Sequence, residues 1–125
     1  PAHMNLGTLY QNTFRYTEAI TQFEQAVYVF PTSWHGYWTL ANAYKNLDEH
    51  RLAIHNYRTA LSINPNEVEI YIDMGESYVA LGDYEQAIQV YETALEIDPM
   101  NDTVVANITR INHLMQDMEQ SREEP

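Results

Sequence analysis

Apolar and small residues recur along this chain every 34 residues, at the three- and four-residue steps of an α-helix within each copy. The rows that keep their chemistry in three copies are Leu6/Leu40/Met74, Gly7/Ala41/Gly75, Tyr10/Tyr44/Tyr78, Ala19/Ala53/Ala87, Phe23/Tyr57/Tyr91, Ala26/Ala60/Ala94 and Pro31/Pro65/Pro99. Steps of i, i+3, i+4 and i+7 place such residues on one face of a helix. The pattern therefore predicts an antiparallel pair of short helices in each copy.

Turn residues and residue sizes support these helix pairs. Prolines follow Asn64 and Asp98, and a proline disfavours helix at the residue before it, so each second helix should end there. Gly82 can supply the left-handed residue that ends a first helix. Small residues alternate with aromatic ones where two helices must approach closely. Because one such pair cannot bury its apolar face alone, successive pairs should stack.

The third copy is similar to the tetratricopeptide repeat (TPR) in many positions at once. The matching residues are Tyr71, Met74, Gly75, Tyr78, Gly82, Tyr84, Ala87, Tyr91, Ala94 and Pro99. The second copy departs at Asp48 and His50, and the first departs at Phe14. The resemblance covers roughly residues 5–101 and implies an all-α fold, a right-handed superhelical solenoid of antiparallel helix pairs.

The repeat register predicts the organisation of the chain. We expect one domain that contains repeat 1 (1–33), repeat 2 (34–67), repeat 3 (68–101), a capping helix or truncated fourth repeat (102–120) and a disordered tail (121–125). Residues 1–4 are expected to be a cleavage and cloning remnant, and the rest a piece of a longer repeat protein.

Composition excludes several classes of protein. No apolar run approaches the roughly 20 residues that cross a bilayer, and no charged-then-apolar leader is present, so the chain is expected to be soluble. The compartment is undetermined, with a cytoplasmic location favoured. The chain has no cysteine, which excludes disulfides and thiolate metal sites.

The acidic charge is concentrated in the third copy. The net charge is −12, and residues 68–101 contain eight acidic and no basic residues. Such a surface repels phosphate backbones and anionic lipids, so we expect neither nucleic acid nor a membrane as a partner. Acidic residues on the outer face, such as Glu92 and Glu96, are expected only to keep the protein in solution.

The TPR resemblance implies that the first helices line a concave groove. The predicted partner-binding residues are Thr8, Gln11, His35, Trp38, Asn42, Lys45, Glu69, Ile72, Asp73, Glu76 and Arg110. Trp38 and Ile72 would anchor apolar side chains, unless they pack against adjacent helices instead. The carboxylates of the third copy would select Lys or Arg.

The same resemblance allows one family function to be compared residue by residue. TPR co-chaperones hold acidic carboxyl-terminal tails of heat-shock chaperones with two lysines, two asparagines and an arginine. The corresponding positions here are Met4, Thr8, Thr39, Glu69 and Asp73. Two carboxylates thus stand where cations are required, and like charges repel in a confined site. The sequence therefore predicts that such tails are not partners.

Catalytic patterns are absent from the sequence. No two of the five histidines lie three or four residues apart, as metal ligands on a helix do, and the four glycines are isolated. We therefore expect no enzyme activity, metal or cofactor. The sequence predicts a non-catalytic module that binds a basic and apolar peptide or helix of a partner protein. The alternatives are a self-association or scaffold segment, with a possible homo-oligomer, and the substrate-targeting arm of an enzyme such as a glycosyltransferase, in which Asn5 and Asn107 would grip peptide backbone.

Overall fold

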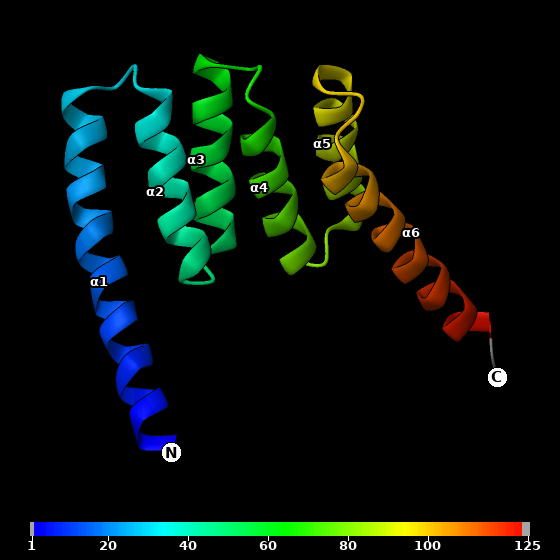
Figure 1. The fold of residues 1–125 in the computed structure, drawn as a ribbon, viewed down its shortest axis with the longest axis horizontal. Coiled ribbons are helices and arrows are strands. Elements are labelled where there is room, and N and C mark those ends of the chain that lie inside the picture. Colours follow the sequence, from blue (N-terminus) through cyan, green and yellow to red (C-terminus); the bar gives the residue numbers. More distant parts are fainter. Residues whose placement is uncertain (1, 124–125) are drawn as a thin grey trace. The chain divides into compact units, whose positions relative to one another are not determined.

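The computed structural model describes residues 2–123, with side chains from Arg15 to Arg122. Within this range it contains six α-helices and no strand, which confirms the all-α prediction (Figure 1). The helices are α1 (Ala2–Val29), α2 (Trp34–Asn46), α3 (His50–Ile63), α4 (Val68–Ala80), α5 (Tyr84–Ile97) and α6 (Asp102–Glu123).

The helices belong to two compact units, residues 1–65 (unit 1) and residues 66–125 (unit 2). In unit 1, α2 and α3 form an antiparallel pair and α1 packs against α2. In unit 2, α4 and α5 form the equivalent pair and α6 packs against α5. The two predicted helix pairs of repeats 2 and 3 are thus confirmed (Figure 1).

The turn chemistry ends the helices where the sequence predicts. Helices α3 and α5 end at Ile63 and Ile97, and the next residues, Asn64 and Asp98, have φ values of −134° and −132° before their prolines. Each first helix ends near a left-handed residue, Asp48 with φ 61° and Gly82 with φ 77°. Asparagine, aspartate and glycine are the residues that tolerate this conformation.

The recurring small and aromatic rows form the buried core of each unit. Fully buried members of these rows are Ala41, Ala53, Tyr57, Ala60, Ala87, Tyr91 and Ala94. A Cβ added to Gly75 would lie 2.4 Å from Cε1 of Tyr91, so α4 and α5 approach each other over the bare glycine backbone. This close approach explains why glycine stands opposite a tyrosine here.

Repeat 1 differs from its predicted helix pair, because α1 is a single helix from Ala2 to Val29. The residue equivalent to Asp48 and Gly82 is Phe14, and an aromatic residue disfavours the left-handed conformation that ends a first helix. The helix therefore continues through this position. The expected antiparallel pair within residues 1–33 is corrected to one helix.

Helix α6 shows the same effect at the other end. Gln116 occupies the turn position, and α6 continues without interruption to Glu123. Val104 and Ile111 of this helix are fully buried. Residues 121–123, expected in a disordered tail, are helical, and residues 124–125 lie outside the described range. Whether α6 is a cap or the start of a fourth repeat stays a prediction.

Candidate functional site

Three aromatic rings form a cluster on the first two turns of α2 in unit 1. The ring centroids of Trp34 and Trp38 are 6.1 Å apart in a stacked arrangement, and His35 meets Trp38 edge to face at 5.6 Å. His35 is exposed and both tryptophans are half-buried. The repeat pattern predicted His35 and Trp38 as binding residues but not Trp34, although Trp34 lies four residues before Trp38 and this spacing places both rings on one helix face.

The polar residues of α2 take part in contacts within unit 1. The Tyr57 hydroxyl of α3 donates a hydrogen bond to Oδ1 of Asn42. Thr39 Oγ1 donates to the main-chain carbonyl of His35 at 2.8 Å. Asn42 and Lys45 are half-buried. The side chains of the two predicted residues on α1, Thr8 and Gln11, lie outside the described range.

Unit 2 gathers two acidic side chains, an amide and a guanidinium around one tyrosine. Asp73 and Glu76 lie one turn apart on α4, Asn107 and Arg110 lie one turn apart on α6, and Tyr91 belongs to α5 between them in sequence. Arg110 Nη2 donates to Asn107 Oδ1 at 3.2 Å. Glu76 and Arg110 are exposed, whereas Asp73 and Asn107 are half-buried. We call these five residues the Tyr91 cluster.

The charges of this cluster act on the Tyr91 hydroxyl. Burial raises the pKa of Tyr91 to about 12, with Glu76 adding to the rise, Arg110 opposing it, Asp73 adding again and the Asn107 side chain opposing it. Although Asn107 is near enough to influence the pKa, no hydrogen bond of acceptable geometry joins it to the hydroxyl. At neutral pH the phenol is protonated and can donate a hydrogen bond.

One predicted anchor is not available on the surface. Ile72 is only 6% exposed, so this side chain belongs to the core, and its predicted role as an apolar anchor is wrong. The physical reason is that α4 is buried on more than one face. Its buried residues include Ile70 and Ile72 in addition to the repeating residues Met74, Gly75 and Tyr78. Glu69, on the same helix, is exposed.

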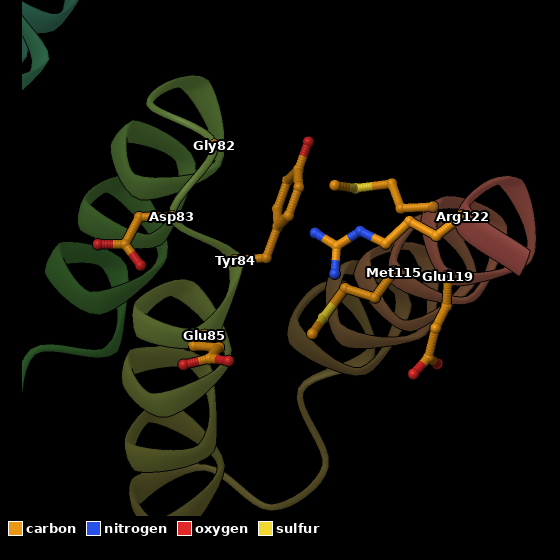
Figure 2. Close-up of a pocket in the computed structure, with 8 residues that line it drawn as sticks. Gly82, Asp83, Tyr84, Glu85, Met115, Glu119 and Arg122 are labelled. Carbon is orange, nitrogen blue, oxygen red and sulfur yellow. The ribbon is translucent and has the colours of Figure 1, made fainter.

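A hollow of about 420 Å³ lies in unit 2 where the second half of α6 passes the start of α5. Figure 2 shows the Tyr84 ring facing Met115 and Arg122 across this space, with Asp83, Glu85 and Glu119 at its edge. The hollow exists because α6 does not turn at Gln116. The repeat pattern does not predict this hollow, because the hollow depends on the direction of α6 relative to α5.

The described residues contain no cluster of candidate metal ligands. Between residues 2 and 123, no group of three His, Asp or Glu side chains is arranged to hold a metal ion. No helix in that range is long and apolar enough to pass through a membrane. What the described surface offers is aromatic, acidic and amide side chains on the first helices of the repeats.

Helix pairs that repeat every 34 residues, with polar and aromatic side chains presented by the first helix of each, define a helical-repeat protein of the solenoid class. Family models agree with this class. Tetratricopeptide repeat models match residues 1–33, 35–67 and 56–89, and a TPR repeat model matches residues 75–108. The chain belongs to the tetratricopeptide repeat family, whose domains are in general non-catalytic interaction modules.

Solved TPR domains have the same fold. The first TPR domain of human RPAP3 is 25% identical with a TM-score of 0.78, and the match covers 94% of this chain and 92% of that domain. The first TPR of Spaghetti (RPAP3), bound to the HSP90 peptide SRMEEVD, is 24% identical with a TM-score of 0.77, covering 90% and 89%. The second TPR domain of human RPAP3, in complex with the HSP70 peptide SGPTIEEVD, is 19% identical with a TM-score of 0.74, covering 87% and 91%. No curated protein sequence matches the chain.

These structures correct one prediction about partners. Two of the similar domains hold peptides with the acidic ending EEVD. The prediction that acidic chaperone tails are excluded as partners is therefore wrong. It relied on charges at five aligned positions, and a domain of this fold has many other side chains with which to hold a peptide.

Proposed function

We propose that this protein-interaction module binds a peptide or helix of a partner protein, using the first-helix side chains that the sequence assigns to a concave groove. The observation that carries the proposal is the aromatic cluster of Trp34, His35 and Trp38, which is partly open to solvent on α2. Tryptophan is enriched among the residues that dominate binding energy, because a large rigid ring buries much area at low entropic cost. This cluster replaces Ile72 as the apolar anchor.

The charge preference would come from α4 in unit 2. Glu69 and Glu76 are exposed and Asp73 is half-buried, all on one helix that has no basic residue. Carboxylates so placed attract a ligand that carries Lys or Arg. Arg110 on α6 moderates this field without reversing it, because it supplies one positive charge against three negative charges.

The test is a titration with a short fluorescein-labelled peptide composed of Lys, Leu and Ser, followed by fluorescence anisotropy. The double variant Asp73→Lys/Glu76→Lys should weaken binding about tenfold or more, because opposite charges become like charges. The matched control is Glu92→Lys/Glu96→Lys, which makes the same change in net charge on exposed positions of α5. The control should change affinity less than threefold.

Two results would contradict the proposal. Equal affinity of the Asp73→Lys/Glu76→Lys variant and the wild type would remove α4 from the binding face. Tighter binding of the SRMEEVD peptide than of the basic peptide by the wild type would contradict the charge preference, and it would make the acidic tail the better ligand. A circular dichroism spectrum of each variant verifies that the helices are intact.

Self-association is a second candidate function, favoured by exposed apolar residues at the end of α1. Tyr28, Val29 and Phe30 are 87%, 63% and 66% exposed. Tyr28 and Val29 also line a hollow of about 510 Å³ on the surface of α1. Adjacent exposed apolar side chains on a small protein mark an interaction surface more often than isolated ones do.

A further inference from the structure

The Tyr91 hydroxyl is a buried polar group without a hydrogen-bond partner. Tyr91 is fully buried. Among the buried side-chain nitrogen and oxygen atoms of the described residues, its hydroxyl oxygen is the one that makes no hydrogen bond. Buried donors are nearly always paired in folded proteins, because an unpaired one loses its bonds to water without replacement. A donor left in this state is ready to bond an acceptor that arrives from outside.

The preceding repeat shows how the same position is normally satisfied. Tyr57 stands 34 residues before Tyr91 and is also fully buried, but its hydroxyl donates to Oδ1 of Asn42. The residue equivalent to Asn42 in the third repeat is Glu76, which is exposed and does not accept from Tyr91. The two repeats therefore differ by one replacement at this position, from the amide of Asn42 to the longer carboxylate side chain of Glu76. The Tyr57 hydroxyl has a hydrogen-bond partner and the Tyr91 hydroxyl does not.

Two of the charged side chains that act on the hydroxyl, those of Glu76 and Arg110, lie at the surface. Glu76 and Arg110 are exposed, so these long side chains can change rotamer at the surface. Asp73 and Asn107, which also act on the hydroxyl, are half-buried, and Asn107 Oδ1 already accepts from Arg110. The cluster thus combines a hydroxyl donor, an amide and carboxylate acceptors at one place in unit 2.

This combination of groups suits a peptide group better than an ion. The charged members Asp73, Glu76 and Arg110 carry −1, −1 and +1, so the cluster has a formal charge of −1 and disfavours a carboxylate as the acceptor. A main-chain peptide group is neutral and presents one acceptor and one donor in a fixed geometry. Its carbonyl fits the hydroxyl, and its N–H fits a carboxylate.

We propose that the Tyr91 cluster binds a main-chain peptide group of the partner segment, with the Tyr91 hydroxyl donating to the carbonyl oxygen and the Asp73 carboxylate accepting from the N–H. This proposal rests on the proposed peptide-binding function and adds a residue to it. It makes Tyr91 a binding residue that holds backbone independently of the partner's sequence. The tyrosine row would then have two roles, with Tyr57 stabilising the fold and Tyr91 binding the ligand.

The experiment compares three tyrosine-to-phenylalanine variants. Tyr91→Phe should reduce the affinity for the bound peptide about threefold to tenfold, which corresponds to the loss of one hydrogen bond. The peptide is the one composed of Lys, Leu and Ser, or SRMEEVD if the wild type binds that one. Tyr84→Phe, on the same helix but outside the cluster, should leave affinity unchanged. Thermal unfolding provides the structural control, because Tyr57→Phe removes a bond to Asn42 and should lower the midpoint, whereas Tyr91→Phe should not.

The outcomes separate this inference from the proposed function. If the wild type binds a peptide and Tyr91→Phe binds it equally well, the inference fails and the function stands. If Tyr91→Phe lowers the unfolding midpoint as much as Tyr57→Phe, the hydroxyl has an internal partner and the inference also fails.

A single-amide probe covers the case in which neither peptide binds. N-methylacetamide at high concentration should then shift the side-chain amide resonance of Asn107 in the wild type but not in Tyr91→Phe. This result supports the inference and shows that neither test peptide is the ligand, whereas equal shifts in both proteins overturn the inference.

Discussion

At the scale of single residues, the size of a side chain at a repeat position determines how closely two helices can pack. Gly75 is the clearest case, since the Tyr91 ring occupies the space where any side chain at residue 75 would stand. Tyr91 is fully buried and cannot move into solvent to make room. One hydrogen atom in place of a methyl group therefore allows α4 and α5 to pack around a tyrosine.

Gly75→Ala should destabilise the protein by about 1–3 kcal/mol, because overpacking a buried contact outweighs the better helix propensity of alanine. The measurement is urea unfolding followed by circular dichroism. Gly36→Ala is the control, since its added Cβ would be 3.0 Å from a single methyl group of Val27, which is half-buried. A Gly75→Ala protein as stable as wild type would show that the helices separate easily.

At the scale of elements, one position per repeat decides whether a helix ends. The residues at this position are Phe14, Asp48, Gly82 and Gln116, and the chain turns only at the two that tolerate positive φ. A second repeat position directly precedes the start of the next first helix, and it is occupied by Ser33, Glu67 and Asn101. Ser33 and Asn101 accept hydrogen bonds from the backbone N–H groups of Gly36 and Val104.

Substitutions at the two turns should have opposite effects on stability. Asp48→Gly should stabilise by about 0.5–1 kcal/mol, because glycine adopts φ 61° without the steric cost that aspartate bears. Gly82→Ala should destabilise by about 1 kcal/mol, and purely through the backbone, since an added Cβ there meets no atom within 4 Å. Thermal unfolding of both variants measures the difference. Shifts of the same sign would show that φ does not control these turns.

At the scale of the whole molecule, charge and exposed apolar area have opposite effects on association. A net charge of −12 makes copies of the chain repel one another, while Tyr28, Val29 and Phe30 present an apolar surface. Salt screens the charges and leaves the apolar surface unchanged. Self-association should therefore depend on ionic strength.

If the end of α1 is a contact between copies, sedimentation velocity should show a dimer that grows with protein concentration and with salt. Tyr28→Ser/Phe30→Ser should remove the dimer, because it takes two exposed rings from the surface. Met100→Ser is the control, since Met100 is 85% exposed in unit 2. A wild type that stays monomeric at all concentrations and salt levels would reject self-association.

The repeat period, the helix pairs of repeats 2 and 3 and the family follow from the sequence alone. They are local properties, because 34-residue spacing and 3.6-residue periodicity can be read along the chain, and Pro65 and Pro99 end helices through their own geometry. The sequence also identified the aromatic and acidic side chains His35, Trp38 and Glu69 as exposed or partly exposed candidates.

The tertiary structure decided which of those candidates reach the surface and which buried groups lack partners. Ile72 is buried although its row suggested an anchor, and Tyr91 lacks the hydrogen bond that Tyr57 makes from the same repeat position. Both depend on side chains of other helices, which periodicity does not place. The continuation of α1 through Phe14, by contrast, is a local property, because it follows from a residue at the turn position that disfavours positive φ. Burial and hydrogen bonding are properties of neighbours in space, and for that reason only the folded structure determines them.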